Sequence, residues 1–141
     1  MEETKEKVLQ RESKGDKVGV GPIPFESIDP HVQTAIKCAA EKKAFDIVAL
    51  DLREIASFTE YFVIVSGGNQ RQAQAISDEI EEQLRKNGVR PVRIEGFQTA
   101  EWILLDFGDF VVHVFDKDAR GFYDLERLWR DAGRVSIPSD I

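Results

Sequence analysis

The strongest constraint on the fold is a pair of apolar runs, residues 102–107 and 110–115, on either side of Gly108-Asp109. Two such runs around a two-residue turn of glycine and aspartate predict a β-hairpin. With these two residues as the loop, Phe107 pairs with Phe110, and the register continues outward from them. Because side chains alternate along a strand, the register also decides which residues share a face. A slip by one residue would exchange the two faces.

The two faces of this hairpin differ in chemistry. The first is entirely apolar and is expected in the core: Ile103, Leu105, Phe107, Phe110, Val112 and Val114. The second is mixed: Trp102, Leu104, Asp106, Val111, His113 and Phe115. Aromatic rings beside carboxylates are typical of protein-binding hot spots, so the mixed face predicts a docking surface. The alternative is a helix that covers this face and makes Trp102 part of the core. An exposed Trp102 predicts that Trp102→Ala weakens partner binding and leaves the fold intact.

The rest of the chain predicts helices and strands around the hairpin. Asp29-Pro30 begins a helix as N-cap and first helical residue, and Gly88 ends the second helix. The expected elements are a helix over 30–43, strands over 46–52 and 61–65, a helix over 69–86, a strand over 91–95 and a helix over 121–133. This order predicts an α/β (α+β) domain, a mixed sheet of about five strands with flanking helices.

The domain organisation follows from where the apolar periodicity begins and ends. Residues 1–28 are polar and contain several Gly and Pro residues, which predicts a flexible N-terminal tail. Residues 29–133 form the predicted domain, and residues 134–141 form a short C-terminal tail.

Composition limits the classes of function. The 141 residues carry a net charge of −7, which disfavours binding to nucleic-acid phosphates, DNA included, and favours a basic protein partner. Cys38 is the one cysteine, so neither a disulfide framework nor a thiolate metal cluster is expected. No apolar run approaches the roughly 18–20 residues that span a bilayer. The N-terminus lacks an apolar signal core, and the protein is expected in the cytoplasm.

One turn suggests a nucleotide site as the competing function. Ser66–Asn69 lies between a predicted strand and a predicted helix, where helix-terminal N–H groups often hold phosphates. With Asp106, this turn would serve a nucleotide-binding or residual nucleotidyltransferase enzyme. The chain lacks the glycine spacing of both common phosphate-binding loops, which favours an ordinary tight turn.

No other residue pattern predicts a reaction centre. Carboxylates occur near predicted strand ends, but no Asp-x-Asp pair in a strand would place two of them on one side, so no metal or other cofactor is expected. His113 has no serine, cysteine or second histidine at a spacing typical of a nucleophile–base pair. We therefore predict no catalytic residues.

Five blocks of the sequence resemble one known family. They are DIVALDL, YFVIVSGGNQRQAQAI, GVRPVRIEG, AEWILLDFGDFVVHVF and RGFYDLERLW, within Pro30 to Ala132. In this order they resemble the ribosomal silencing factor family, RsfS, which is also called Iojap-related. The resemblance implies a nucleotidyltransferase-like fold without catalytic carboxylates. It also implies a non-enzymatic function.

The resemblance further implies a partner and a site. Family members bind the large ribosomal subunit through ribosomal protein L-fourteen and sterically block subunit joining, which represses translation. Free members are often homodimers. Carried onto this chain, the expected partner contacts are Trp102, Asp106, His113 and Phe115 with Glu95 nearby, followed by Arg120 and Tyr123.

Overall fold

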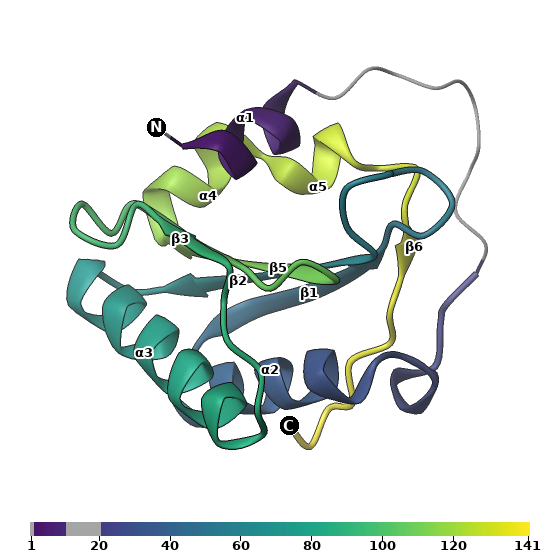
Figure 1. Ribbon diagram of the computed structural model, residues 1–141, viewed down its shortest axis with the longest axis horizontal. Coiled ribbons are helices and arrows are strands. Elements are labelled where there is room, and N and C mark those ends of the chain that lie inside the picture. Colours follow the sequence, from purple (N-terminus) through teal and green to yellow (C-terminus); the bar gives the residue numbers. More distant parts are fainter. Residues whose placement is uncertain (1, 11–20) are drawn as a thin grey trace.

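In the computed structural model, which describes residues 2–10 and 21–141, a six-stranded sheet lies between two layers of helices (Figure 1). The strands are β1 Phe45–Asp51, β2 Tyr61–Gly67, β3 Arg93–Glu95, β4 Trp102–Asp106, β5 Phe110–Asp116 and β6 Gly133–Arg134. The helices are α1 Glu3–Leu9, α2 Pro30–Glu41, α3 Gln70–Lys86, α4 Lys117–Tyr123 and α5 Leu125–Leu128, with a 3₁₀ turn at Phe25–Ser27. None of these helices is long and apolar enough to cross a membrane.

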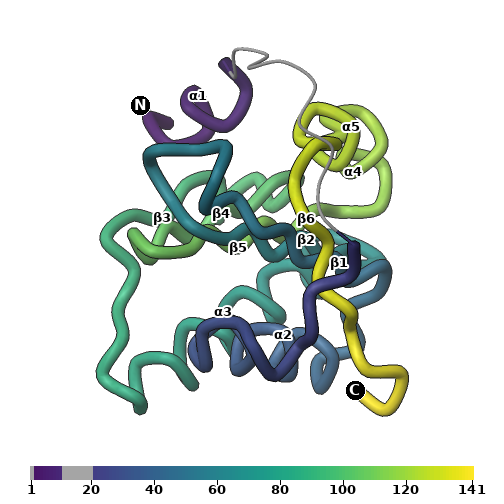
Figure 2. The backbone as a smooth tube through the Cα atoms, turned by 90° about the vertical axis from the view of Figure 1, so that its right-hand side faces the viewer, coloured from purple at the N-terminus to yellow at the C-terminus, as the bar shows by residue number. Residues whose placement is uncertain are grey.

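The sheet is mixed, and its strand order is β3-β4-β5-β2-β1-β6. The central pair, β2 and β5, is parallel, and the other neighbours are antiparallel. Helices α2 and α3 cover one face, while α1, α4 and α5 lie over the other (Figures 1 and 2). The predicted mixed α/β architecture is confirmed. The sixth strand is β6, whose Arg134 pairs with Leu50 of β1.

The predicted hairpin is β4 and β5, and its register is confirmed. Ile103 pairs with Val114 and Leu105 with Val112. At the turn, the Phe107 N–H donates to the Phe110 carbonyl oxygen at 2.9 Å. Gly108 has a φ of +86°, a conformation that glycine adopts without steric cost.

Each face of the sheet has its own hydrophobic cluster. The cluster beneath α2 and α3 contains all six residues of the predicted apolar face of the hairpin. The opposite cluster contains Trp102, Leu104, Val111 and Phe115 of the mixed face, together with residues of α1 and α5. Both faces of the hairpin are therefore buried.

Helices α2 and α3 begin where the sequence predicts. Asp29 Oδ1 accepts from the His31 N–H, and Asn69 Oδ1 accepts from the Gln72 N–H, both at 2.8 Å. These side chains satisfy backbone donors that a helix start leaves without partners. Cys38 is buried on α2, and this burial raises the pKa of its thiol to about 11, so the thiol stays protonated near neutral pH.

Both predicted tails contain ordered elements, contrary to expectation. Within residues 1–28, α1 packs on the sheet and Phe25 is buried, while residues 1 and 11–20 lie outside the described part. In the C-terminal stretch, Val135 is buried, and its N–H donates to the carbonyl oxygen of Ala49 at 3.0 Å. Tertiary contacts hold both stretches in place, so no local apolar period marks them in the sequence.

The last predicted helix is two helices, α4 and α5, and not one. Asp116 begins α4 by accepting from the Ala119 N–H at 2.8 Å, four residues earlier than expected. Asp124 has a φ of +47° and breaks the helix between Tyr123 and Leu125. One continuous helix over 121–133 would place Phe122 on the same apolar stripe as Leu125 and Trp129, but its side chain is 81% exposed.

Candidate protein-docking site

The residues predicted for partner contact gather on one side of the sheet. Glu95 comes from β3, Trp102 and Asp106 from β4, His113 and Phe115 from β5, and Arg120 and Tyr123 from α4. The register places Leu104 between Glu95 and His113 across three strands, so these side chains share the face that α1 and α4 cover. The predicted grouping is therefore present, but its exposure differs from the prediction.

Trp102 is a core residue in this structure. Its side chain is 2% exposed, and its ring stacks on Phe115 at 5.3 Å and meets Tyr123 of α4 at 4.6 Å between centroids. Its Nε1–H donates to His113 Nδ1 at 3.0 Å. The expectation of an exposed Trp102 is wrong, because α1 and α4 both lie over the indole.

His113 and Phe115 lie deeper still, and both are fully buried. Burial lowers the pKa of His113 to about 3, and the positive charges of Lys5 and Arg120 act in the same direction. The imidazole is therefore neutral near neutral pH, with Nδ1 as the acceptor for Trp102. Its other face meets Phe62 edge-to-face at 4.5 Å. Direct partner contact by these two side chains is incompatible with their position.

Glu95 and Asp106 bind a segment that was expected to be a flexible tail. Glu95 is 5% exposed, and its carboxylate accepts from the Thr4 N–H at 2.9 Å and from the Lys5 N–H at 3.0 Å. Asp106 Oδ2 accepts from Thr4 Oγ1 at 2.7 Å, and its Oδ1 accepts from the Gly108 N–H at 2.8 Å. Both carboxylates are thus occupied by α1.

Arg120 joins three elements from inside the structure. Its Nη1 donates to Ser66 Oγ of β2 at 2.8 Å, and its Nη2 donates to Glu126 Oε2 of α5 at 2.9 Å. The side chain is largely buried and fixes α4 and α5 on the sheet. Ser66, which the competing hypothesis placed in a nucleotide site, is buried and uses its hydroxyl as the acceptor for Arg120.

Phe122 is the site residue that sequence reasoning missed. It stands on the surface of α4, where its ring meets Tyr123 at 5.0 Å in an edge-to-face arrangement. Tyr123 in turn rests on Trp102, so a continuous series of rings runs from the sheet to the surface. The signal that could have located Phe122 is Asp124, since aspartate is among the residues that tolerate a left-handed backbone at a helix end.

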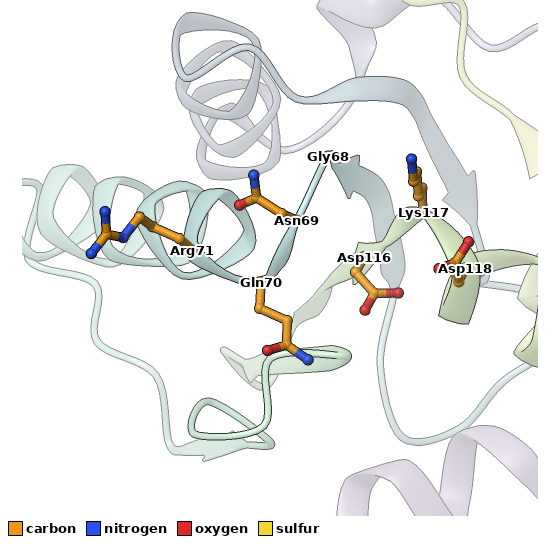
Figure 3. A pocket seen from close by; sticks show the side chains of 7 residues that line it. All are labelled: Gly68, Asn69, Gln70, Arg71, Asp116, Lys117 and Asp118. Atoms are coloured by element: carbon orange, nitrogen blue, oxygen red, sulfur yellow. The ribbon is translucent and has the colours of Figure 1, made fainter.

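The turn considered for nucleotide binding lines an open hollow of about 470 Å³ between the starts of α3 and α4 (Figure 3). Gln72 Oε1 accepts from the Gly68 N–H at 2.7 Å, and Asn69 Oδ1 accepts from the Gln72 N–H, so side chains already occupy two donors. Asp116 and Asp118 line this hollow beside Lys117, while Arg71, which also lines it, extends away from them along α3 (Figure 3). This arrangement is a poor phosphate cradle. Within the described ranges, no three His, Cys, Asp or Glu side chains cluster as a metal site would require.

Nucleotide should therefore leave the thermal stability unchanged. We expect millimolar ATP with Mg²⁺ to shift the melting temperature no more than Mg²⁺ alone. A ligand that binds only the native state at ten times its dissociation constant would stabilise it by about 1.4 kcal/mol, which thermal-shift measurements resolve. A rise of several degrees that is lost in Arg71→Ala would contradict this and support a nucleotide site at the hollow.

Comparison with known proteins decides the family. The model of the family described as "Ribosomal silencing factor during starvation", RsfS, matches residues 25–141. The chain belongs to the RsfS family. It is 46% identical over 101 residues to the ribosomal silencing factor RsfS of Bacillus subtilis, an alignment that covers 72% of this chain and 86% of the relative. The family names indicate translation regulation.

A solved structure and a more distant relative agree with this membership. An X-ray crystal structure of a Chromobacterium violaceum protein matches with a TM-score of 0.70 at 34% identity, over 77% of this chain and 88% of that one. The mouse protein named "Mitochondrial assembly of ribosomal large subunit protein 1" is 28% identical over 112 residues, 77% of this chain and 49% of its own length.

The RsfS match also separates α1 from the rest of the site. Glu95, Trp102 and Asp106 lie inside the matched residues 25–141, whereas α1, which contacts all three, precedes them. In this RsfS member, a segment outside the family match therefore covers part of the face on which the predicted contacts gather.

Proposed function

We propose that this RsfS member binds the large ribosomal subunit through ribosomal protein L-fourteen in the cytoplasm and prevents the small subunit from joining. It thereby represses translation by obstruction and without catalysis. The family match over residues 25–141 carries the proposal. The mouse relative supports the choice of subunit, because its name links it to the large one.

The proposed docking face consists of α4 and the adjoining edge of the sheet. Its residues are Glu95, Trp102, Asp106, Phe122 and Tyr123, and Arg120 fixes α4 on the sheet from inside. Phe122 supplies an exposed aromatic side chain, and Tyr123 and Trp102 support it from below. A supported aromatic side chain with charged neighbours is typical of a binding hot spot. His113 and Phe115 lie beneath this face and hold Trp102 in place.

Charge supports a basic protein as the partner. The chain carries 26 acidic and 19 basic residues, a net charge of −7, which accelerates encounter with a positively charged protein surface. The same charge repels bare RNA, so recognition of a ribosomal protein fits better than recognition of rRNA. An interface of about 800 Å² per partner is enough for stable attachment.

Phe122→Ala should weaken binding to purified large subunits at least tenfold, about 1.4 kcal/mol, because it removes the exposed ring of the docking face. The matched control is Val92→Ala, which truncates a side chain that is 71% exposed beside β3. Co-sedimentation measures the affinity, and light scattering of mixed subunits measures joining. We expect the native protein and Val92→Ala to block joining, and Phe122→Ala to need a higher concentration.

Three results would contradict the proposal. Native protein that co-sediments with assembled ribosomes as well as with free large subunits would exclude obstruction. Isolated L-fourteen that fails to capture the native protein would exclude that contact. Equal affinity of Phe122→Ala and native protein would remove α4 from the interface.

A further inference from the structure

Helix α1 lies on the docking face and contacts it through one side only, as a bound helical peptide would. Only Thr4 and Val8 of this helix are buried, and they lie one turn apart on the side that meets the sheet. Thr4 bonds both Glu95 and Asp106, and the Lys5 ammonium lies 4.7 Å from the centre of the Trp102 ring. At its other end, the Val8 carbonyl oxygen accepts from Trp129 Nε1 at 3.2 Å.

Almost nothing within α1 itself can keep it in place. A helix of seven residues is too short to be stable alone in water, and no side chain caps its start. Its position therefore depends on contacts with the rest of the chain: Glu95, Asp106, Trp102, Trp129 and Arg93, which forms an ion pair with Glu3. Among the described residues, Val8 is the one member of the two core clusters that lies outside residues 23–141, so α1 supplies a single side chain to the described core.

The surface beneath α1 is a built acceptor for a basic, hydroxyl-bearing segment. Glu95 accepts two backbone N–H groups, Asp106 accepts a hydroxyl, and the Trp102 ring receives an ammonium group. Lysine and hydroxyl side chains are what a basic ribosomal protein offers. α1 therefore supplies in cis the chemistry that the proposed partner would supply in trans.

We propose that α1 is an intramolecular cap on the docking face and competes with the ribosomal partner for Glu95, Asp106 and Trp102. The inference rests on the proposed function for the identity of that partner. Binding then requires α1 to leave the face. The apparent affinity is therefore the intrinsic affinity multiplied by the fraction of molecules in which α1 has left. A face that is open in one molecule in ten binds tenfold more weakly than an uncapped one.

The test uses the full chain and places a charge in the cap. Val8→Asp puts a carboxylate into the apolar contact of α1, and Leu9→Asp adds the same charge at a neighbouring position that is 41% exposed. We expect Val8→Asp to bind purified large subunits about tenfold more tightly than the native chain. Leu9→Asp should bind as the native chain does.

The two tryptophans report directly on whether α1 has left. The chain contains only Trp102 and Trp129, so an NMR spectrum of ¹⁵N-labelled protein has two indole signals. Trp129 Nε1 donates to Val8, whereas Trp102 Nε1 donates to His113 within the sheet. In Val8→Asp we expect faster solvent exchange at the Trp129 indole and continued protection at the Trp102 indole, which shows that the domain stays folded.

A second variant covers the case in which Val8→Asp disturbs the core. Thr4→Pro removes the N–H that binds Glu95 and the hydroxyl that binds Asp106, in a first helical turn where proline is tolerated. It should also bind large subunits more tightly. Unchanged or weaker binding by a variant with α1 released overturns the cap and leaves the proposed function intact. Failure of the native chain and every variant to bind large subunits overturns both.

Discussion

Trp102→Ala is expected to lower the free energy of unfolding by about 3–5 kcal/mol, as for large-to-alanine changes in other cores. The indole is buried between Phe115 and Tyr123, so its removal leaves a cavity that backbone strands cannot close. It also leaves the buried Nδ1 of His113 without its donor. Urea unfolding at pH 7, followed by circular dichroism, measures the loss. This reverses the sequence-based expectation that the substitution leaves the fold intact.

One variant separates the cavity from the hydrogen bond, and a second is the control for an exposed ring. Trp102→Phe keeps a ring but lacks the N–H donor, and should cost about 1–3 kcal/mol. Phe122→Ala removes an exposed ring of the same docking face and should change stability by no more than about 0.5 kcal/mol. A loss below about 1 kcal/mol for Trp102→Ala would mean that Trp102 is not a core residue.

The stability of the protein is expected to fall as the pH drops from about 6.5 toward 3, because of His113. Its pKa is about 3 in the folded protein, and about 6.5 is usual for an unfolded chain. Between these values the unfolded state binds one more proton than the folded state, so acid favours unfolding. The slope approaches about 1.4 kcal/mol per pH unit below the unfolded pKa, which amounts to roughly 2 kcal/mol between pH 6.5 and 4.5 because the unfolded histidine is already half protonated at pH 6.5. Urea unfolding at both pH values measures it.

His113→Asn is the matched variant for this prediction. The asparagine Oδ1 can accept from Trp102 Nε1 in place of Nδ1, but the side chain does not titrate. Carboxylates contribute to the pH dependence of both proteins and cancel in the difference. We expect the variant to be less stable at pH 6.5 and to have a slope smaller by about one proton. Equal slopes would mean that His113 titrates normally in the folded state.

Much of the fold could be predicted because its signals are local. The Gly108-Asp109 turn and the alternation around it were enough for the register of β4 and β5. Asp29 and Asn69 marked the starts of α2 and α3 through capping bonds that span two or three residues. Such contacts depend on neighbours in the sequence, so they can be recognised without the rest of the structure.

The covering of the mixed face could not be predicted, because it depends on distant contacts. Thr4 reaches Glu95 across 91 residues, and Val8 is the one apolar side chain that α1 buries. A single buried valine among charged residues has no helical period to detect. The hairpin pattern correctly grouped the site residues on one face, but alternation alone does not show whether another element lies over that face.

The outward position of Phe122 was missed for a different reason. A continuous helix would place Phe122, Leu125 and Trp129 on one stripe, at spacings of three and four residues. The left-handed Asp124 ends α4 and starts α5 in a new direction, so Leu125 is buried while Phe122 is not. The backbone of one residue therefore decides which aromatic side chain is available to a partner.

The parallel pairing of β2 with β5 has a consequence for synthesis of the chain. Val63 and Val112 are register partners 49 positions apart (112 − 63), and α3, β3 and β4 lie between these strands in the sequence. At a synthesis rate of roughly 5–20 residues per second, the edge of β2 that pairs with β5 stays unpaired on the nascent chain for about 2–10 s. β1 can occupy only the opposite edge of β2 during that time. Slower elongation lengthens the interval in which an apolar strand edge is free to aggregate.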